Sequence, residues 1–262
     1  MEDPGKYLTS MRQTAPLVHN ITNYVAMNVM ANVLLASGAS PAMVHAREEV
    51  AEFAGLAQAL SINIGTVSPP WAEAMEAAAT AASAKDIPWV LDPVAVGATD
   101  YRRALGTRLV ELRPTVIRGN ASEILALAGE AGAGKGADAT ESVETAEGAA
   151  RALARHSGAV VAVTGAVDFV TDGERAARVA NGHAMMPRVT ALGCSLTGVV
   201  AAYLAGQPRF EAVIAALAYF GLAGERAGAT AQGPGSFQVA FLDALHDIDA
   251  EALSAGARIE PA

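Results

Sequence analysis

The feature that most restricts the fold of this chain is a repeated alternation of short apolar runs with longer segments of helical periodicity. The apolar runs lie at residues 42–44, 60–64, 89–91, 115–117 and 160–163. They lack polar alternation, which is typical of parallel strands covered on both faces. Helical patterns occupy residues 26–36, 48–60, 71–83, 101–112 and 142–155. This alternation predicts an α/β fold with a mostly parallel central sheet flanked by helices on both faces.

The pattern changes after residue 163. Residues 167–171 and 175–179, separated by Asp172 and Gly173, predict an antiparallel hairpin. Three further helices are predicted at residues 194–204, 211–227 and 237–245. The chain has 262 residues, 52% of them hydrophobic, and shows no internal repeat or linker. We therefore expect one domain over residues 1–262, with a single large core.

Charge and cysteine content exclude several classes of function. The net charge is −9 without a cluster of Lys and Arg, so we expect no nucleic-acid partner. The one cysteine, Cys194, has no partner for an internal disulfide, which indicates a reducing compartment. The longest apolar run, residues 212–224, is shorter than the about 20 residues that a membrane span needs. Because the N-terminus also lacks a signal-peptide pattern, we expect a cytoplasmic protein that does not bind membranes.

A glycine-rich segment imitates a phosphate-binding loop. Gly129 to Lys135 has the GxxxxGK spacing, but Gly136 stands where Ser or Thr should bind magnesium. The segment also follows a helical pattern, whereas a P-loop follows a strand. We interpret it as a surface loop.

A stronger anion site is predicted at residues 190–198, TALGCSLTG. A turn of small residues leads directly into an apolar helix, so the N–H groups of Ala191 through Cys194 would be free at the positive end of the helix dipole. Such a site stabilises charge on a transferring phosphoryl group. An ordinary helix start has the same pattern, and this segment alone does not separate the two.

Cys194 has three possible roles. Thiols at helix N-termini have lowered pKa values, so we expect an accessible thiolate, and a general base is the first of these roles. A covalent nucleophile would need an activating group nearby in the fold. A buried, inert cysteine is the third alternative.

Polar residues follow several predicted strands. They are Asn63 to Thr66, Asp92, Arg118 to Asn120, and Thr164 with Gly165. Because ligands of open α/β sheets bind beyond the carboxyl ends of the strands, we expect these clusters to converge. Asn120 and Glu123 suit either a magnesium site or a helix capping box. The run HNITN at residues 19–23 carries more polar groups than helix capping explains.

At these residues the sequence resembles the hydroxyethylthiazole kinase family. The motifs are residues 16–43 (PLVHNITNYVAMNVMANVLLASGASPAM), 63–66 (NIGT), 91–99 (LDPVAVGAT), 118–124 (RGNASEI), 163–165 (VTG), 191–198 (ALGCSLTG) and 233–237 (GPGSF). The resemblance implies a ribokinase-like fold. It also implies ATP- and Mg²⁺-dependent phosphorylation of 4-methyl-5-(2-hydroxyethyl)thiazole for thiamine salvage, in a homotrimer with active sites at subunit boundaries.

The resemblance also implies roles for individual residues. It places Cys194 as the catalytic base; Asn23, Met43, Gly65, Thr66 and Ala191 around the thiazole; Arg118, Asn120, Thr164, Gly165 and Gly193 around ATP; and Asp92 and Glu123 on Mg²⁺. The family usually has Gly-Thr-Gly-Cys at the anion site. This chain has Ala191 and Leu192 in place of the first two residues, so it gains a methyl group and lacks a hydroxyl.

Features of the sequence argue against three other functions. Another ribokinase-like enzyme, such as a hydroxymethylpyrimidine kinase or a nucleotide-repair dehydratase, would lack the HNITNYV motif. A non-catalytic nucleotide-binding regulator would have no need of Asp92, Glu123 and Cys194 together. A P-loop NTPase is opposed by Gly136.

Overall fold

One mixed sheet organises the part of the chain that the computed structural model describes, residues 3–129 and 143–262. Within these residues the sheet has nine strands in the order β2-β1-β3-β4-β5-β6-β7-β8-β9. The parallel strands are β1 (Leu17–Ile21), β2 (Ser40–Ala42), β3 (Ala59–Asn63), β4 (Trp89–Asp92), β5 (Val116–Asn120) and β6 (Val160–Thr164). The antiparallel strands are β7 (Asp168–Thr171), β8 (Ala176–Val179) and β9 (Ile259–Pro261). The mostly parallel α/β sheet is confirmed.

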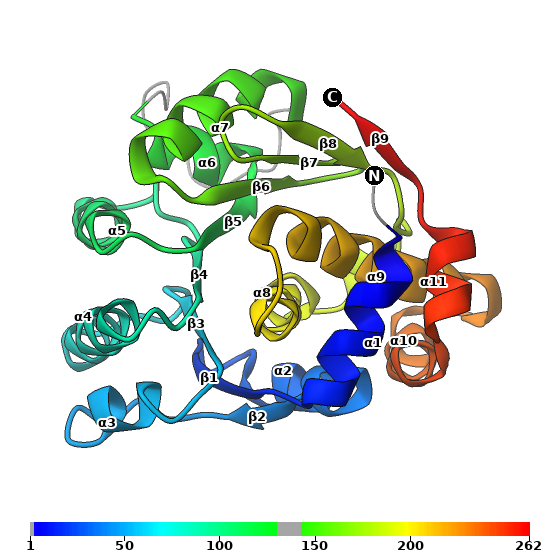
Figure 1. Cartoon of the computed structure of the whole chain (residues 1–262), viewed down its shortest axis with the longest axis horizontal. Helices are drawn as coiled ribbons and strands as arrows, with labels where there is room; N and C mark the ends of the chain where they lie inside the picture. Colours follow the sequence, from blue (N-terminus) through cyan, green and yellow to red (C-terminus); the bar gives the residue numbers. More distant parts are fainter. Residues whose placement is uncertain (1–2, 130–142) are drawn as a thin grey trace.

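Helices cover both faces of this sheet (Figure 1). One layer contains α3 (Val50–Ala54), α4 (Pro69–Ala84), α5 (Asp100–Glu111), α6 (Ala121–Leu127) and α7 (Val143–Ser157). The other contains α1 (Pro4–Thr14), α2 (Met27–Ser37), α8 (Leu192–Leu204), α9 (Arg209–Thr230) and α10 (Pro234–Asp247), with α11 (Ala250–Gly256) against α1 and α9. A short 3₁₀ turn, Met186–Arg188, precedes α8. No described helix is both long enough and apolar enough to cross a membrane.

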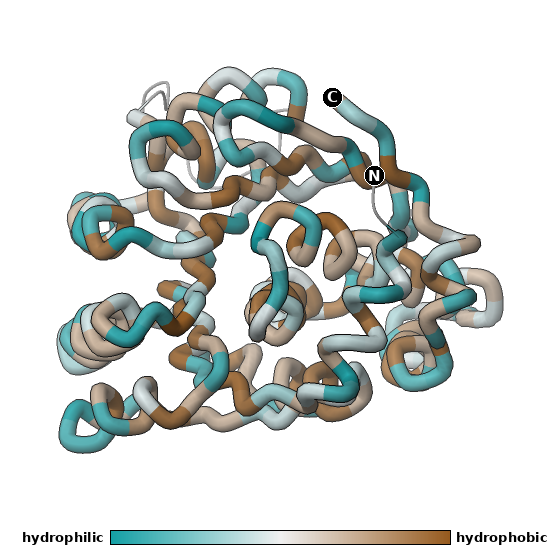
Figure 2. The backbone as a smooth tube through the Cα atoms, viewed as in Figure 1, coloured by the Kyte–Doolittle hydropathy of each residue, from teal (hydrophilic) through white to brown (hydrophobic). Residues whose placement is uncertain are grey.

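The core consists of two hydrophobic layers separated by the sheet. Successive side chains of β6 alternate between them: Val160 and Ala162 pack against α8 and α9, whereas Val161 and Val163 pack against the α4–α7 layer. This alternation follows from the two-residue period of a strand. Figure 2 shows hydrophobic residues concentrated along the central strands and the helix surfaces that face them. Burial on both faces explains the uninterrupted apolar runs in the sequence.

Several predicted boundaries were wrong. The strand expected at residues 42–44 is β2, Ser40–Ala42, and the helix expected at residues 48–60 is only α3, Val50–Ala54, because β3 already begins at Ala59. Elements α1, β1, α11 and β9 were not predicted. The hairpin is confirmed, with Asp168 paired to Val179. Apart from Gly129, the glycine-rich segment that imitates a P-loop lies outside the described residues. Residue 142, the first residue of the helix expected at 142–155, also lies outside them.

The position of β1 determines where a ligand site can form. β2 lies on one side of β1 and β3 on the other, so the chain leaves the carboxyl end of β1 in one direction and reaches β3 in the other. Open α/β sheets form their ligand crevice at such a reversal of strand order. We therefore expect the site beyond the ends of β1 and β3.

Candidate functional site

A chain of polar side chains crosses the carboxyl ends of β1, β3 and β4. Asn23 Nδ2 donates to Asn63 Oδ1 at 2.9 Å, and Asn63 Nδ2 donates to Asp92 Oδ2 at 2.7 Å. The N–H of Gly65 also donates to Asn63 Oδ1 at 2.9 Å. A Cβ atom at Gly65 would lie 2.9 Å from Asn23 Cβ, so only glycine permits this close approach. The structure thus brings Asn23, Gly65 and Asp92 together, as the sequence predicts.

Asp92 is the most buried carboxylate of this network, with 1% of its surface exposed. Its Oδ2 accepts from Thr197 Oγ1 at 2.8 Å in addition to Asn63. Burial raises the pKa of Asp92 to about 6, although the Arg118 guanidinium opposes the shift and the charge of Glu123 adds to it. Asp92 Oδ1 is buried and has no hydrogen-bond partner among the described residues. A buried acceptor of this kind is suited to a cation.

Arg118 connects three elements around Asp92. Its Nη1 donates to the Gly193 carbonyl at 3.0 Å and lies 3.5 Å from Asp92 Oδ2. Its Nη2 donates to Thr164 Oγ1 at 2.8 Å. The guanidinium therefore fixes the end of β6 and the start of α8 relative to β4. A planar, permanently charged fork in this position also suits phosphate oxygens.

Cys194 lies in the first turn of α8, at the end of the network. Asn23 Nδ2 donates to its Sγ at 3.3 Å. Helix α8 begins at Leu192, so the N–H groups of Leu192, Gly193 and Cys194 have no carbonyl within the helix to bind. The helix start on which the predicted anion site depends is present, with Ala191 as the cap residue. The side chain of Leu192 is buried in the core layer beneath.

The expected accessible thiolate is wrong for the protein without ligands. Burial raises the pKa of the Cys194 thiol, and the nearby Asp92 carboxylate raises it further; the hydrogen bond from Asn23 opposes both effects. Helix position alone predicted the opposite direction, because the sequence does not show that Asp92 lies close to the sulfur. Cys194 is therefore a neutral thiol at neutral pH.

Asn120 and Glu123 form the capping box of α6. Asn120 Oδ1 accepts from the Glu123 N–H at 2.9 Å, and Glu123 Oε2 accepts from the Asn120 N–H at 2.8 Å. Glu123 Oε1 also accepts from the Ala95 N–H at 3.0 Å, which ties the loop after β4 to α6. Ala95 holds a φ of 54°, a conformation uncommon for residues with a side chain. The capping interpretation is correct, and each carboxylate oxygen of Glu123 keeps a further lone pair besides the one it uses.

These residues fit a magnesium ion bound together with phosphate. No cluster of three or more His, Cys, Asp or Glu side chains that could hold a metal occurs within residues 3–129 and 143–262. Mg²⁺ does not require one, because it keeps several waters and takes one or two carboxylates plus substrate phosphates. The partnerless Oδ1 of Asp92, with Glu123 close enough to shift the pKa of Asp92, matches that requirement.

The remaining predicted residues follow the carboxyl ends of β2, β3 and β6. Thr66 Oγ1 accepts from the Tyr24 N–H at 3.1 Å, which joins the loops after β3 and β1. Met43 directly follows β2 and packs, partly buried, against the core layer that contains α2 and α8. The N–H of Gly165 donates to Asp168 Oδ1 at 2.9 Å.

Two functional neighbours were missed in the sequence. Thr197 lies three residues after Cys194 on α8, and that helical spacing was the available signal. Asp168 opens an apolar strand, and nothing in its surroundings distinguished it.

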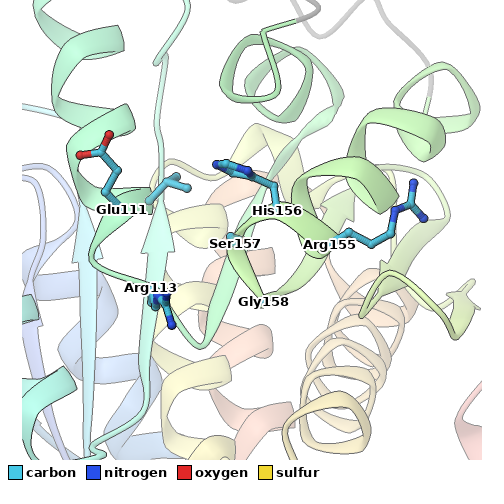
Figure 3. Close-up of a pocket in the computed structure, with 7 residues that line it drawn as sticks. Glu111, Arg113, Arg155, His156, Ser157 and Gly158 are labelled. Carbon is cyan, nitrogen blue, oxygen red and sulfur yellow. The ribbon is translucent and has the colours of Figure 1, made fainter.

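A separate hollow of about 400 Å³ lies at the opposite end of the strands, beside the residues that precede β5 and β6 (Figure 3). Glu111, Arg113, Arg155, His156, Ser157 and Gly158 line it with Val110. In Figure 3 the Arg155 side chain points away from His156, and its Nη1 donates to the Gly173 carbonyl at 3.1 Å. The lining side chains do not converge, so we do not place the functional site there.

Replacing Ala191 by Gly should stabilise the protein. Ala191 has φ 65°, and this left-handed conformation costs a residue with a Cβ roughly 1–2 kcal/mol. Glycine removes that cost but gives the unfolded chain more conformational entropy, which offsets part of the gain. We expect Ala191→Gly to raise the free energy of unfolding by up to about 1 kcal/mol in urea titrations. Ala15→Gly is the matched control, because Ala15 has φ 42° at the end of α1, outside the site. A loss of stability in both variants would contradict the strain.

Asp168 should make stability depend on pH. Burial raises the pKa of Asp168 from its ordinary 3.8 to about 7, although the Gly165 N–H and Arg118 oppose the shift. Between about pH 4 and 7 the carboxyl is neutral in the folded protein and charged in the unfolded chain. The free energy of unfolding therefore falls as pH rises through this range, by at most about 4 kcal/mol. Asp168→Asn keeps an oxygen for Gly165 but does not titrate. Thermal unfolding should show the variant more stable than wild type at pH 8, with a smaller difference at pH 5. A difference independent of pH would contradict this prediction.

Known proteins share this sequence and architecture. A profile of the hydroxyethylthiazole kinase family matches residues 8–251. A protein named hydroxyethylthiazole kinase from Cereibacter sphaeroides ATCC 17023 is 69% identical over the whole of both chains. Another of the same name, from Rhizobium leguminosarum bv. trifolii, is 61% identical over 99% of this chain and 98% of its own. The solved hydroxyethylthiazole kinase of Pyrococcus horikoshii OT3 is 40% identical over the whole of both chains, with a TM-score of 0.93. Staphylococcus aureus pyridoxal kinase, at 16% identity and a TM-score of 0.66 over 94% and 98% of the chains, shares the fold.

Proposed function

This chain belongs to the hydroxyethylthiazole kinase family, and we propose that it transfers the γ-phosphoryl group of ATP to the hydroxyl of a hydroxyethylthiazole at the site between Asp92 and Cys194. One observation supports this placement most strongly. Hydrogen bonds through Asn23 and Asn63 connect the Cys194 thiol, at a helix N-terminus, to the buried carboxylate of Asp92, whose Oδ1 has no partner among the described residues. An acceptor alcohol, a phosphoryl group and a cation each find suitable partners within this network.

The acceptor hydroxyl is positioned by Asn23 and Cys194 in this proposal. Its O–H donates to Cys194 Sγ while its oxygen attacks the γ-phosphorus in line. The bond from that phosphorus to the β–γ bridging oxygen breaks, and ADP leaves with the electron pair. A loose transition state asks little of the base until the new P–O bond is well formed, so the proton passes late to sulfur. Sulfur can take this proton only as a thiolate, so the thiol proton of Cys194 first passes to solvent. Offsetting the Asp92 charge would favour this loss, because that charge is one of the two causes that raise the pKa of the thiol.

Charge on the transferring group is stabilised from two sides. The N–H groups of Leu192, Gly193 and Cys194 lie at the positive end of α8, and Arg118 lies beside Gly193. Asp92 and Glu123 are proposed to hold Mg²⁺, which would neutralise phosphate charge when bound. Arg118, Asn120, Thr164, Gly165 and Gly193 are proposed to contact ATP.

The acceptor side is proposed to comprise Asn23, Met43, Gly65, Thr66 and Ala191. Crowding by Asn23 and Asn63 leaves no room for a side chain at Gly65, so only glycine fits beside Asn23 in the acceptor loop. We further propose that residues 1–262 form one kinase domain that acts in the cytoplasm in thiamine salvage. No observation favours the pyrimidine-kinase or regulator alternatives.

We expect a homotrimer in solution. Tyr24 and Val25 directly follow Asn23 and expose 63% and 57% of their surfaces, which is unusual for apolar side chains beside an active site. A neighbouring subunit covering them would place the acceptor site at a subunit boundary. Light scattering at assay concentration should give three times the chain mass. An active monomer would contradict this prediction.

The proposed function is tested by offering MgATP with either of two alcohols. We expect ATP-dependent formation of the thiazole phosphate and far slower reaction of hydroxymethylpyrimidine. Preference for the pyrimidine alcohol would favour the alternative kinase, and ATP binding without transfer to either alcohol would favour the regulator.

A further inference from the structure

Arg102 lies on α5 behind the site and binds two of the loops that carry proposed site residues. Its Nη1 donates to the carbonyls of Ile64 at 2.7 Å and Val94 at 2.9 Å, and its Nη2 donates to the carbonyl of Gly65. Ile64 and Gly65 belong to the loop after β3, whereas Val94 belongs to the loop after β4. No ion-pair partner of Arg102 lies within 4.0 Å in the described parts of the chain.

The three carbonyls are those that the sheet leaves without strand partners. Pairing of β3 with β4 ends at Asn63 and Asp92, followed by one last bond from the Ile64 N–H to the Asp92 carbonyl at 3.2 Å. Beyond this point the two backbones separate toward α4 and α5. In place of strand-to-strand hydrogen bonds, the planar guanidinium of Arg102 donates to carbonyls of both loops at once.

The loops joined in this way carry opposite halves of the proposed site. Gly65 precedes Thr66, and its N–H binds Asn63, which binds both Asn23 and Asp92. Val94 follows Asp92 and precedes Ala95, whose N–H binds Glu123. A displacement of either loop therefore changes the distance between the acceptor alcohol and the phosphoryl group.

We propose that Arg102 is a positioning residue for phosphoryl transfer, which sets the acceptor loop at residues 64–66 against the metal loop at residues 92–95. The inference rests on the proposed function, since it assigns these loops to the two reactants. Arg102 itself touches neither reactant. Asp92 is also held by Thr197, and the proposed ATP contacts come from β5, β6 and α8, so the loss of Arg102 should affect the alcohol more than MgATP.

Arg103 provides a matched control on the same helix. Its guanidinium binds the Gly97 carbonyl and Asp100, both within the loop and first turn of α5 itself, and its side chain is exposed. Arg103→Ala thus removes an arginine of equal size and charge without releasing the loop after β3. Exposed pairs of this kind contribute little.

The test compares steady-state kinetics of wild type, Arg102→Ala, Arg102→Lys and Arg103→Ala with the thiazole alcohol and MgATP. We expect Arg102→Ala to lower kcat/KM for the alcohol about 100-fold, the usual effect of a misplaced reactant, while KM for MgATP changes about twofold or less. Arg102→Lys should recover about tenfold, because an ammonium reaches the carbonyls without the fork geometry. Guanidinium ion at sub-denaturing concentration should also raise the activity of Arg102→Ala but not of Arg103→Ala.

Two results would overturn the proposal. One is an Arg102→Ala enzyme that matches Arg103→Ala; the other is a parallel loss of alcohol and MgATP binding that neither lysine nor guanidinium restores. If Arg102→Ala does not fold, Arg102→Lys carries the test: a raised alcohol KM at unchanged MgATP KM supports the proposal, and wild-type kinetics overturn it. An inactive wild type would contradict the proposed function, whereas an active wild type with an unaffected Arg102→Ala contradicts the role of Arg102 alone.

Discussion

Cys194→Ala should lose most of kcat while its affinity for ATP stays close to that of wild type. Sγ accepts a hydrogen bond from Asn23 and lies at the start of α8, where the acceptor hydroxyl is proposed to bind. Alanine leaves no group to receive the proton, and the loss of a general base typically costs about 10²–10⁴-fold. The residues proposed to contact ATP include Arg118, Thr164 and Gly193, which hydrogen-bond to one another without the sulfur. Steady-state kinetics with nucleotide binding measured by calorimetry separates the two effects.

Cys194→Asp is the companion variant and should remain active. A carboxylate can accept the same proton, and the helix N-terminus stabilises its charge. Because Asp92 lies close enough to raise the pKa of residue 194, we expect the activity of Cys194→Asp to increase with pH. An inactive, folded Asp variant that binds both substrates would indicate a nucleophilic or steric role. A fully active Cys194→Ala enzyme would return the residue to core packing.

Glu123→Gln should reduce turnover strongly and raise the Mg²⁺ concentration needed for half-maximal activity. The substitution removes the charge proposed to hold the metal, and we expect a loss of about 10²-fold in kcat. Glutamine also has one oxygen where Glu123 uses two to accept the Asn120 and Ala95 N–H groups, which costs about 1 kcal/mol of stability. Urea unfolding measures this structural part separately from turnover.

Glu225→Gln serves as the matched control for the metal prediction. Glu225 accepts from Asn181 Nδ2 at 3.0 Å and from the Gly182 N–H at 2.9 Å and forms an ion pair with Arg258, so its partners follow β8 and not the strands that carry the site. It should lose stability on a similar scale and keep its Mg²⁺ dependence. Unchanged turnover of Glu123→Gln at saturating Mg²⁺ would leave the capping box as the whole role of Glu123.

Apolar runs were sufficient to predict the parallel sheet, because strands buried on both faces have no polar alternation. The same rule concealed β1, whose sequence contains His19 and Asn20. Both are completely or almost completely buried, and they bind the carbonyls of Val44 and Val18 at 2.8 Å. Buried polar groups satisfied by backbone look like a loop in sequence. Without β1, the reversal of strand order that locates the crevice was not predictable.

Local chemistry was predictable where it depends on neighbours in sequence. The capping box of Asn120 and Glu123 was one of the two alternatives that the sequence left open, and the structure contains it. The predicted helix start after Ala191 is also present, at Leu192. The pKa of Cys194 was not predictable, because it depends on Asp92, a residue distant in sequence and adjacent only in the fold. The same holds for Arg102, whose three carbonyl partners lie in two other loops.

The stereochemistry of transfer tests most directly the claim that one in-line displacement occurs at this site. The γ-phosphorus of ATP is made chiral with oxygen isotopes and sulfur, and the configuration of the thiazole thiophosphate that forms is determined. Direct attack by the alcohol, with Cys194 receiving only the proton, predicts inversion at phosphorus. Retention would require two displacements through a phosphorylated enzyme group, with Cys194 the nearest candidate, and would contradict the account.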